Sequence, residues 1–251
     1  MKVGFIGAGN MARALARGWG EPVLCTDSGS GRAQALADEL GGEALASNRE
    51  LAERADVVIL AHKPAQLGAI ASEAAGAKTV VSLLARTTQA DVRAAYPGVP
   101  AFRVMPNTPV ELRRGAIAFA DPEPDAGIDE GLRIRIRDLF ARVGTVVDVP
   151  EKLMGIAGAC SGVGPAYWAL LVEAQVDAAI RRGLPADIAS ALVVETMAGT
   201  AELLRTREGD TFGVRRDVTS PGGTTAAGLA ALERGGVRAA FAGAMDDVVG
   251  G

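Results

Sequence analysis

Three small residues near the start of the chain have the spacing of a dinucleotide-binding turn. Gly7, Gly9 and Ala12 follow an apolar run over Val3–Ile6 and lead into a stretch of helical composition. Glycine at 7 allows a tight turn, glycine at 9 lets the backbone approach a pyrophosphate, and Ala12 lets the helix pack close to the strand. A glycine turn can also be only a turn, but its place directly after a strand favours a cofactor site.

Two further stretches of small residues, Cys160–Tyr167 and Thr219–Thr225, precede expected helices in the second half of the chain. As loops, each would offer backbone N–H groups and hydroxyls at the positive end of a helix, which suits a small carboxylate. Either loop alone is equally compatible with ordinary helix capping. We therefore expect an anion site here, with capping as the alternative.

The second half lacks the side chains that a dehydrogenase normally uses to move the proton of a hydroxyl group. No lysine or histidine follows Lys152, whereas reduction of C=O normally needs such an acid or base. A protonated imine needs only hydride delivery to carbon, because its nitrogen arrives with its charge and proton. The absence favours C=N as the bond reduced.

Asp27 lies at the end of an expected strand, about 20 residues after the glycine turn, where a dinucleotide fold places the group that meets the adenosine ribose. A carboxylate there favours the 2′-hydroxyl of NAD. The neighbouring Ser28, Ser30 and Arg32 are donors that suit the 2′-phosphate of NADP. Alternatively, Asp27 caps a helix that begins near Gly31. The choice between NADPH and NADH is open at this point.

Other polar residues follow expected strands, at the sheet edge where open α/β folds bind ligands. Lys63 and Pro64 come after an apolar strand over residues 57–61, so we expect Lys63 beside the cofactor. Asn107 lies in a stiff loop between two prolines, either a simple turn or a contact for the nicotinamide half of the cofactor. His62 is the only histidine, and a lone histidine at a strand end is more often a packing residue than a catalyst.

The elements that must position these residues alternate between strand and helix as far as about residue 150. Expected strands cover residues 3–6, 22–26, 57–61, 79–84, 101–105, 116–120 and 145–149. Expected helices begin at residue 11, near residue 31, at a capping box over 47–50, at 87 and near 128. This alternation predicts an α/β, doubly wound sheet.

The pattern changes at residues 150–152, after which only Ala-rich helical segments follow, over about 165–182, 186–207, 225–234 and 237–249. We expect a nucleotide-binding domain over 1–150 and an all-α domain over 151–251. The second domain is small for a core of its own, and its apolar positions recur around much of each helix. We therefore expect it to form a homodimer.

Bulk properties exclude several classes of protein. The 251 residues carry a net charge of −4 with no Lys/Arg-rich tract, so neither nucleic acid nor an anionic membrane is an expected partner. No uninterrupted apolar run approaches the ~20 residues of a membrane span, and a cytoplasmic protein is expected. Cys25 and Cys160 lack a C-x-x-C spacing, so we expect free thiols and no metal.

Three segments, residues 103–109, 161–167 and 218–229 with Leu232 and Glu233, resemble signature sequences of the Δ1-pyrroline-5-carboxylate reductases. The similarity runs from Val3 to about Val249, and the stretch Ser-Pro-Gly-Gly-Thr-Thr at 220–225 is highly specific. The resemblance implies NADPH- or NADH-dependent reduction of pyrroline-5-carboxylate, a small cyclic imino acid, to L-proline, the last step of proline biosynthesis. It also implies a Rossmann domain followed by a helical dimerisation domain, with dimers often assembled into rings.

The resemblance also implies roles for single residues. The substrate carboxylate would lie on the loop formed by Ser220, Gly222, Gly223 and Thr224, and Thr225 would bind the ring nitrogen as the catalytic residue. The cofactor contacts that it implies are Gly7 to Met11, the loop of Asp27 and Ser28, Lys63, Pro64 and Asn107.

Some positions depart from the family pattern. Val163 replaces a usual serine, Gly158 a common threonine, Arg86 an expected glycine, and His62 a small or apolar residue. The alternative is therefore a divergent paralogue that reduces another cyclic imino acid. A β-hydroxyacid dehydrogenase is a weaker alternative, because such an enzyme should carry a lysine on the first long helix after the linker, and none occurs over residues 165–182. A non-catalytic NAD(P)-binding assembly protein is the third.

Overall fold

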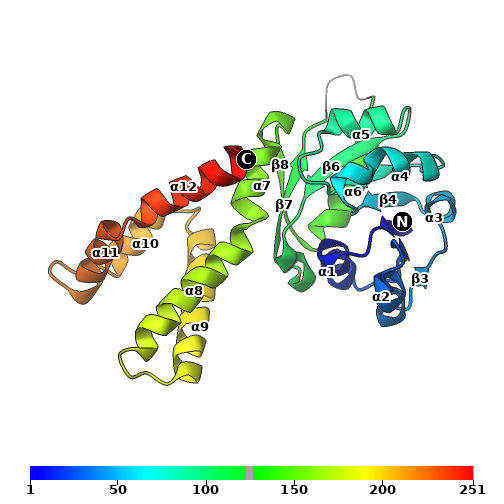
Figure 1. The fold of residues 1–251 in the computed structure, drawn as a ribbon. Helices are drawn as coiled ribbons and strands as arrows, with labels where there is room; N and C mark the ends of the chain where they lie inside the picture. The colour runs from blue at the N-terminus through cyan, green and yellow to red at the C-terminus, as the bar shows by residue number, and fades with distance from the viewer. Residues whose placement is uncertain (123–126, 251) are drawn as a thin grey trace. The chain divides into compact units, whose positions relative to one another are not determined.

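The computed structural model describes residues 1–122 and 127–250, which form two compact units, Met1–Pro165 and Ala166–Gly251 (Figure 1). The first unit contains one eight-stranded sheet in the order β3-β2-β1-β4-β5-β6-β7-β8. Neighbouring strands pair in parallel, except that β6 and β7 are antiparallel. The strands are β1 (Val3–Ile6), β2 (Leu24–Thr26), β3 (Glu43–Ala44), β4 (Val57–Leu60), β5 (Val80–Ser82), β6 (Ala101–Met105), β7 (Gly115–Ala120) and β8 (Gly144–Val149).

Helices connect these strands. The α-helices of the first unit are α1 (Asn10–Trp19), α2 (Arg32–Leu40), α3 (Asn48–Arg54), α4 (Leu67–Glu73), α5 (Gln89–Ala95), α6 (Glu130–Ala141) and α7 (Met154–Ser161). Short 3₁₀ helices are η1 (Pro64–Gln66), η2 (Thr108–Leu112) and η3 (Glu151–Leu153). Because only η2 lies between β6 and β7, the chain makes no crossover there and the two strands run in opposite directions.

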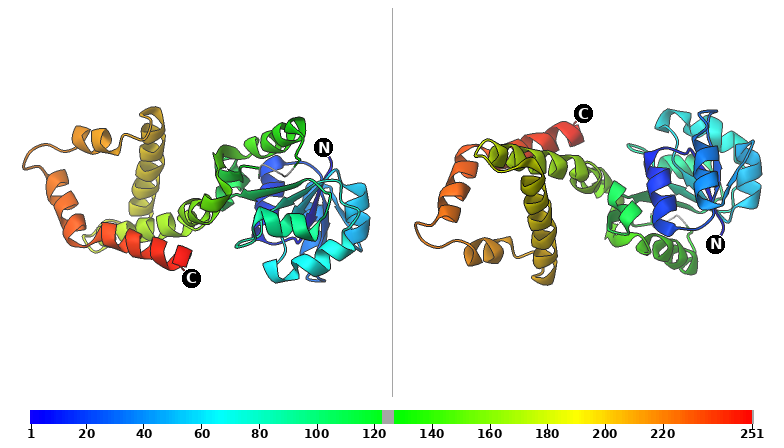
Figure 2. Two further views of the ribbon diagram at one scale, coloured as in Figure 1. Left: turned by 90° about the horizontal axis from the view of Figure 1, so that it is seen from above. Right: turned by 90° about the horizontal axis from the view of Figure 1, so that it is seen from below.

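Side chains on the central strands alternate between two apolar cores. Phe5 on β1 and Ile59 on β4 belong to the core that also contains residues of α1, α2 and α6. Ile6 and Leu60 belong to the core with α3, α4 and α5. The alternation follows from the period of two along a strand, and Figure 2 shows helices on both faces of the sheet. The predicted doubly wound α/β fold is confirmed.

The last strand ends at Val149, and every described element after it is helical. The division between the compact units nevertheless falls after Pro165, later than the expected boundary at 150. Met154 explains the difference, because this first residue of α7 is buried against Ala118 and Ala120 of β7. Residues 151–165 thus pack with the sheet of the first unit.

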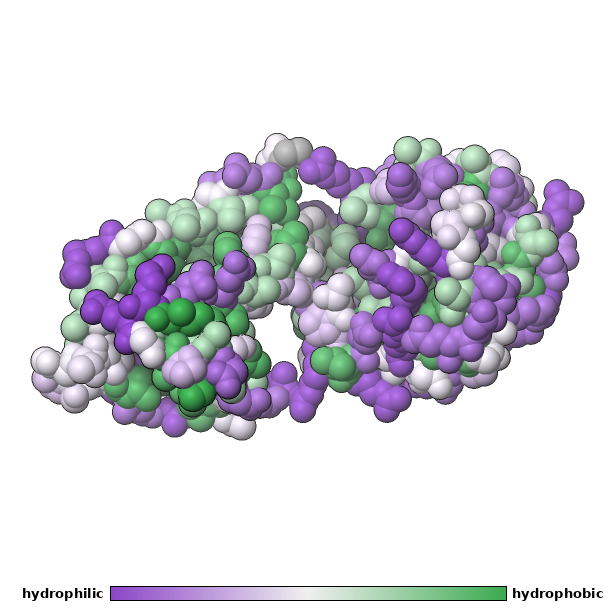
Figure 3. All heavy atoms as spheres, turned by 60° about the horizontal axis from the view of Figure 1, so that its bottom comes forward, coloured by the Kyte–Doolittle hydropathy of each residue, from purple (hydrophilic) through white to green (hydrophobic). Residues whose placement is uncertain are grey.

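The second unit contains α9 (Ala186–Thr206), α10 (Thr211–Asp217), α11 (Thr224–Arg234), α12 (Val237–Gly250) and nearly all of α8 (Gly164–Ile180). Ala189 and Val193 are the only buried apolar side chains among its described residues. Large apolar groups face outward instead, with Trp168 54% and Leu170 62% exposed. Figure 3 shows such side chains, in green, gathered over the helical unit. This unit has almost no core of its own.

The helical stretch over residues 151–180 is long enough to span a membrane, and an 18-residue window within it has a mean hydropathy of 1.3, with 11% of that window buried. Length and composition alone are weak evidence for a span. An exposed apolar helix of this kind equally suits burial against another protein chain.

One local prediction is largely wrong. Most of Cys160–Tyr167 is helical, because α7 continues to Ser161 and α8 begins at Gly164, and only Gly162 and Val163 lie between the two helices. The N–H of Gly162 donates to Gly158 O at 2.8 Å, and Ser161 Oγ donates to Ala157 O at 3.0 Å. These two groups are therefore engaged within the helical run and are not available to an anion.

Candidate functional site

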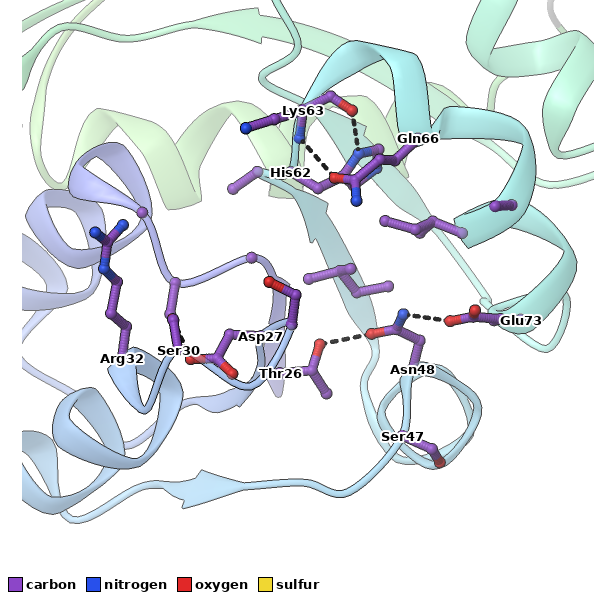
Figure 4. A pocket seen from close by; sticks show the side chains of 18 of the residues that line it. Thr26, Asp27, Ser30, Arg32, Ser47, Asn48, His62, Lys63, Gln66 and Glu73 are labelled. Atoms are coloured by element: carbon purple, nitrogen blue, oxygen red, sulfur yellow. Dashed lines mark hydrogen bonds between the residues drawn. The ribbon is translucent and has the colours of Figure 1, made fainter.

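A cavity of about 850 Å³ lies at the carboxyl ends of β1, β2 and β4 (Figure 4). The chain runs outward from β1 in both directions across the sheet, so this is the switch point where open α/β sheets bind ligands. The residues that line it are Ile6, Gly7, Ala8, Gly9, Thr26, Asp27, Ser28, Ser30, Arg32, Ala46, Ser47, Asn48, Arg49, Ala61, His62, Lys63, Gln66, Ala69, Ile70 and Glu73.

The glycine turn forms one wall of this cavity. Gly7 has φ +100°, and a Cβ there would lie 2.7 Å from Ala61 O, so only glycine fits without strain. A Cβ on Gly9 would have no heavy atom within 4 Å, which leaves open space at the N-terminus of α1. No side chain caps that helix end. Its backbone N–H groups therefore fit the pyrophosphate of a dinucleotide.

Asp27 lines the cavity, but its carboxylate is already bonded within its own loop. Oδ1 accepts from the N–H of Gly29 at 2.8 Å, and Oδ2 accepts from Ser30 Oγ at 2.8 Å and from the N–H of Ala33 at 3.0 Å. Burial raises the pKa of Asp27, but these hydrogen bonds lower it by more, so the pKa falls to about 2. The structure therefore shows the capping interaction with α2 that the sequence left as an alternative.

The residues after β3 form the opposite wall, and sequence reasoning missed them. Asn48 Oδ1 accepts from Thr26 Oγ1 at 2.6 Å, and Asn48 Nδ2 donates to Glu73 Oε2 at 2.6 Å (Figure 4). Ser47 and Arg49 line the same wall. The predicted capping box is half formed, because Ser47 Oγ accepts from the N–H of Glu50 while the Glu50 carboxylate pairs with Arg54.

Lys63 follows β4 and lines the cavity with an exposed side chain, and its contact with a cofactor stays a prediction. His62 Nδ1 lies 2.9 Å from Lys63 O, so the ring donates to that carbonyl. Burial lowers the pKa of His62, partly offset by that bond. His62 also lines the cavity, and the packing role that the sequence favoured stays a prediction.

Four other residues predicted to contact the cofactor do not line the cavity: Asn10, Met11, Pro64 and Asn107. Asn10 Oδ1 accepts from Arg13 Nη2 at 2.7 Å, and Pro64 begins η1. The Asn107 side chain, 7% exposed, accepts from the N–H of Ala116 and donates to Ser161 O. Its amide joins β7 to α7, and the expected cofactor contact stays a prediction.

The segment Thr219–Thr225 lies in the helical unit and opens α11, as predicted. Gly222 has φ +69°, and the N–H of Gly223 donates to Ser220 O at 3.0 Å, which closes a tight turn. Gly223 is the N-cap residue, and no side chain caps the helix. Thr225 is half-buried in the first turn, while Ser220, Gly222 and Thr224 are exposed. The loop thus offers hydroxyls and N–H groups to a small anion.

In the described parts of the chain, no group of three or more His, Cys, Asp or Glu side chains could hold a metal ion. Cys25 and Cys160 are free thiols. Burial, together with the charge of Asp27, raises the pKa of Cys25 to about 11, so this thiol stays protonated. Cys160 lies in α7 rather than in the loop that the sequence suggested.

Comparison with known proteins adds an independent observation. The profile "Pyrroline-5-carboxylate reductase dimerisation" matches residues 151–250, and the profile "NADP oxidoreductase coenzyme F420-dependent" matches residues 2–86. The chain is 35% identical to a pyrroline-5-carboxylate reductase of Synechocystis, over 96% of this chain and 93% of that protein.

Solved structures of such reductases have the same fold over nearly the whole chain. The Streptococcus pyogenes enzyme matches with a TM-score of 0.90 at 29% identity, covering 99% of this chain and 96% of that one. The Plasmodium falciparum enzyme, solved with NADP bound, matches with a TM-score of 0.88 at 26% identity, covering 99% and 95%. With its glycine-turn cavity, its helical unit and this full-length similarity, the chain belongs to the pyrroline-5-carboxylate reductase family.

Proposed function

We propose that this protein reduces 1-pyrroline-5-carboxylate to L-proline with NADPH or NADH. The observation that carries the proposal is the Thr219–Thr225 turn, which presents uncapped N–H groups at the start of α11. Membership of the reductase family and the glycine-turn cavity support the same reaction.

The residues of the α11 turn suit the two polar groups of the substrate. A carboxylate accepts hydrogen bonds from N–H groups and hydroxyls, and the N-terminus of a helix favours its negative charge. Ser220 and Thr224 supply exposed hydroxyls, and Gly222 and Gly223 expose backbone. Thr225 has its hydroxyl in the first helical turn, and we assign to it the hydrogen bond with the ring nitrogen.

The chemistry needs little from acid or base residues. NADPH or NADH bound in the glycine-turn cavity would supply a hydride to the imine carbon. The C=N π electrons would then become a lone pair on nitrogen, and the amine would take its further proton from water. The helical unit has no lysine or histidine for proton transfer, which agrees with an iminium substrate. The task of the protein is then to orient the ring and to hold the carboxylate.

A second copy of the chain is the partner that we assign to the helical unit. Its described residues bury only Ala189 and Val193 among apolar side chains, and the dimerisation profile covers the same helices. Burial against another chain would also cover the apolar window over 151–180. We propose that the protein forms a homodimer in the cytoplasm. Several such dimers would assemble further into a ring.

Assembly has a direct test. Leu170 and Leu112 are both highly exposed, 62% and 78%, but only Leu170 lies in the helical unit. Leu170→Asp should lower the sedimentation mass to that of a monomer, whereas Leu112→Asp should keep the mass of the wild-type protein. A wild-type mass equal to one chain would refute the dimer.

One assay tests the reaction. NADPH and NADH oxidation should each be followed with 1-pyrroline-5-carboxylate and with its six-membered homologue. Turnover faster with the five-membered ring supports the proposal, and faster turnover with the six-membered ring identifies a divergent paralogue. Cofactor binding without oxidation across such imines would point to a non-catalytic assembly protein.

A further inference from the structure

We propose that the adenosine end of the cavity selects the 2′-phosphorylated cofactor, with Arg32 and Arg49 as the residues that bind the 2′-phosphate. The inference rests on the proposed NAD(P)H-dependent function and deepens it. It runs against the simplest interpretation of the sequence, in which Asp27 after β2 would bind the ribose hydroxyls of NAD.

Asp27 is the residue that would exclude a 2′-phosphate, and the structure shows that its acceptor capacity is used. A carboxylate has about four lone-pair sites. Three of these accept from the N–H of Gly29, Ser30 Oγ and the N–H of Ala33, and the backbone of Arg32 contributes a further bond. A ribose hydroxyl that donated to Asp27 would have to displace one of these bonds.

The second acid in the cavity is engaged as well. Glu73 Oε2 accepts from Asn48 Nδ2 at 2.6 Å, and Asn48 in turn accepts from Thr26 Oγ1. Figure 4 shows Glu73 beyond Asn48, on the side of the pocket opposite to Arg32 and Ser30. Both carboxylates therefore accept hydrogen bonds from the walls of the cavity.

The cations of the same cavity are not neutralised. Arg32 on α2, Arg49 on α3 and Lys63 after β4 all line it. Arg32 and Arg49 are exposed, and neither forms an ion pair with the described residues around it. Guanidinium groups bind phosphate oxygens through several N–H donors at once. Arg32 begins α2 after β2, and Arg49 lies in the first turn of α3 after β3, so two such groups at these strand ends suit an extra phosphate.

The serines complete the donor set. Ser30 donates its hydroxyl hydrogen to Asp27, while the exposed Ser28 beside it has no bond to the described residues and is free to donate. A hydroxyl and two guanidinium groups together offer a 2′-phosphate more hydrogen bonds than a 2′-hydroxyl can use. The cofactor class that fits is NADPH.

Binding measurements by titration calorimetry test the inference without any turnover. The wild-type protein should bind NADPH at least tenfold more tightly than NADH, and the fragment 2′,5′-ADP more tightly than 5′-AMP. Arg32→Gln and Arg49→Gln should each weaken NADPH binding by about ten- to a hundredfold, the range for a hydrogen bond to a charged group. Their NADH affinities should change less than threefold. Arg135→Gln, on α6 and outside the cavity, is the matched control.

The double variant Arg32→Gln/Arg49→Gln decides the outcome. Loss of the preference for NADPH supports the inference, and a wild-type preference in that variant overturns it. Equal or tighter binding of NADH by the wild-type protein also overturns it, while the reductase function stands. Binding of neither dinucleotide would instead refute the proposed function itself. If the Asp27→Asn substitution selectively weakens the binding of NADH, Asp27 binds the ribose and the inference fails.

Discussion

Arg103 on β6 and Glu151 at the start of η3 form a buried ion pair, with Arg103 Nη1 2.6 Å from Glu151 Oε1. Their side chains are 6% and 19% exposed. The same Glu151 oxygen accepts from the N–H of Gln89 at 2.9 Å, so one carboxylate joins α5, β6 and the segment that leads into α7. This pair fixes where the helical run leaves the sheet.

Removal of one partner should destabilise the first unit strongly. Glu151→Ala leaves the Arg103 charge buried without its counterion, which we expect to lower the free energy of unfolding by about 3–5 kcal/mol. Urea unfolding would measure the change. Glu21→Ala is the control, because Glu21 pairs with Arg142 at the surface and exposed pairs contribute at most about 1 kcal/mol. Equal effects of the two substitutions would contradict a special role for Glu151.

The two glycines of the turn should separate folding from cofactor binding. Gly7→Ala forces a Cβ to within 2.7 Å of Ala61 O at φ +100°, so we expect a clear loss of thermal stability. Gly9→Ala meets no heavy atom within 4 Å and should leave the melting temperature unchanged. It should weaken dinucleotide binding, because the added methyl group occupies the approach to the backbone. Unaltered NADPH affinity in Gly9→Ala would place the pyrophosphate elsewhere.

How far the sequence predicts this site depends on how local the signal is. The glycine turn was predictable, because an apolar run, two glycines and a helix lie within a few residues of one another. The wall formed by Asn48 and Arg49 was not, since β3 is only the pair Glu43–Ala44, too short to leave a periodic pattern. Without that strand, the following residues looked only like a helix cap.

Composition misled the prediction of the Cys160–Tyr167 loop for a different reason. Small residues suggest a loop, but here α7 continues through them to Ser161. The N–H of Gly162 donates to Gly158 O, and Ser161 Oγ donates to the carbonyl of Ala157 one turn earlier. Composition alone does not show that these groups bond to the preceding helical turn.

Asp27 shows a third case, where two interpretations were open and geometry was needed to choose. Its place after β2 suits a ribose contact, and its distance from α2 suits a cap. The bond from the N–H of Ala33 shows the cap. The choice depended on the turn over residues 28–31, where Gly29 and Gly31 both have positive φ.

Arg86 should be a site where glycine stabilises the protein. It lies in the turn after β5 with φ +57°, a left-handed conformation that costs a residue with a side chain roughly 1–2 kcal/mol. The exposed Arg86→Gly variant should therefore raise the free energy of unfolding by up to about 1 kcal/mol after the larger chain entropy of glycine is counted. Arg113→Gly is the control at φ +58°, because Arg113 Nε donates to Gly18 O and that bond is lost. Destabilisation by Arg86→Gly would show that its side chain has a role.

Acid should weaken the fold through Asp27. Its pKa is about 2 in the folded protein against an ordinary value of 3.8, so the unfolded chain binds the proton more readily. The ionised carboxylate therefore stabilises the fold above about pH 4, and this contribution is lost as the pH falls toward 2. The melting temperature of Asp27→Asn should be lower than that of the wild-type protein at neutral pH. It should also fall less steeply between pH 4 and pH 2. Asp38→Asn, on the exposed face of α2, is the matched control.

The hydroxyl of Thr225 should matter for turnover and little for folding. Thr225 lies in the first turn of α11, half-buried, beside the tight turn at Gly222. Loss of one positioned hydrogen bond to the ring nitrogen should lower kcat about ten- to a hundredfold in Thr225→Ala. Thr225→Ser keeps a hydroxyl and should recover most of the rate, and both variants should melt within a few degrees of the wild-type protein. Thr224→Ala, at the expected carboxylate contact, should raise KM more than it lowers kcat. Full kcat in Thr225→Ala would remove this residue from the mechanism and leave orientation of the imine to the backbone of the loop.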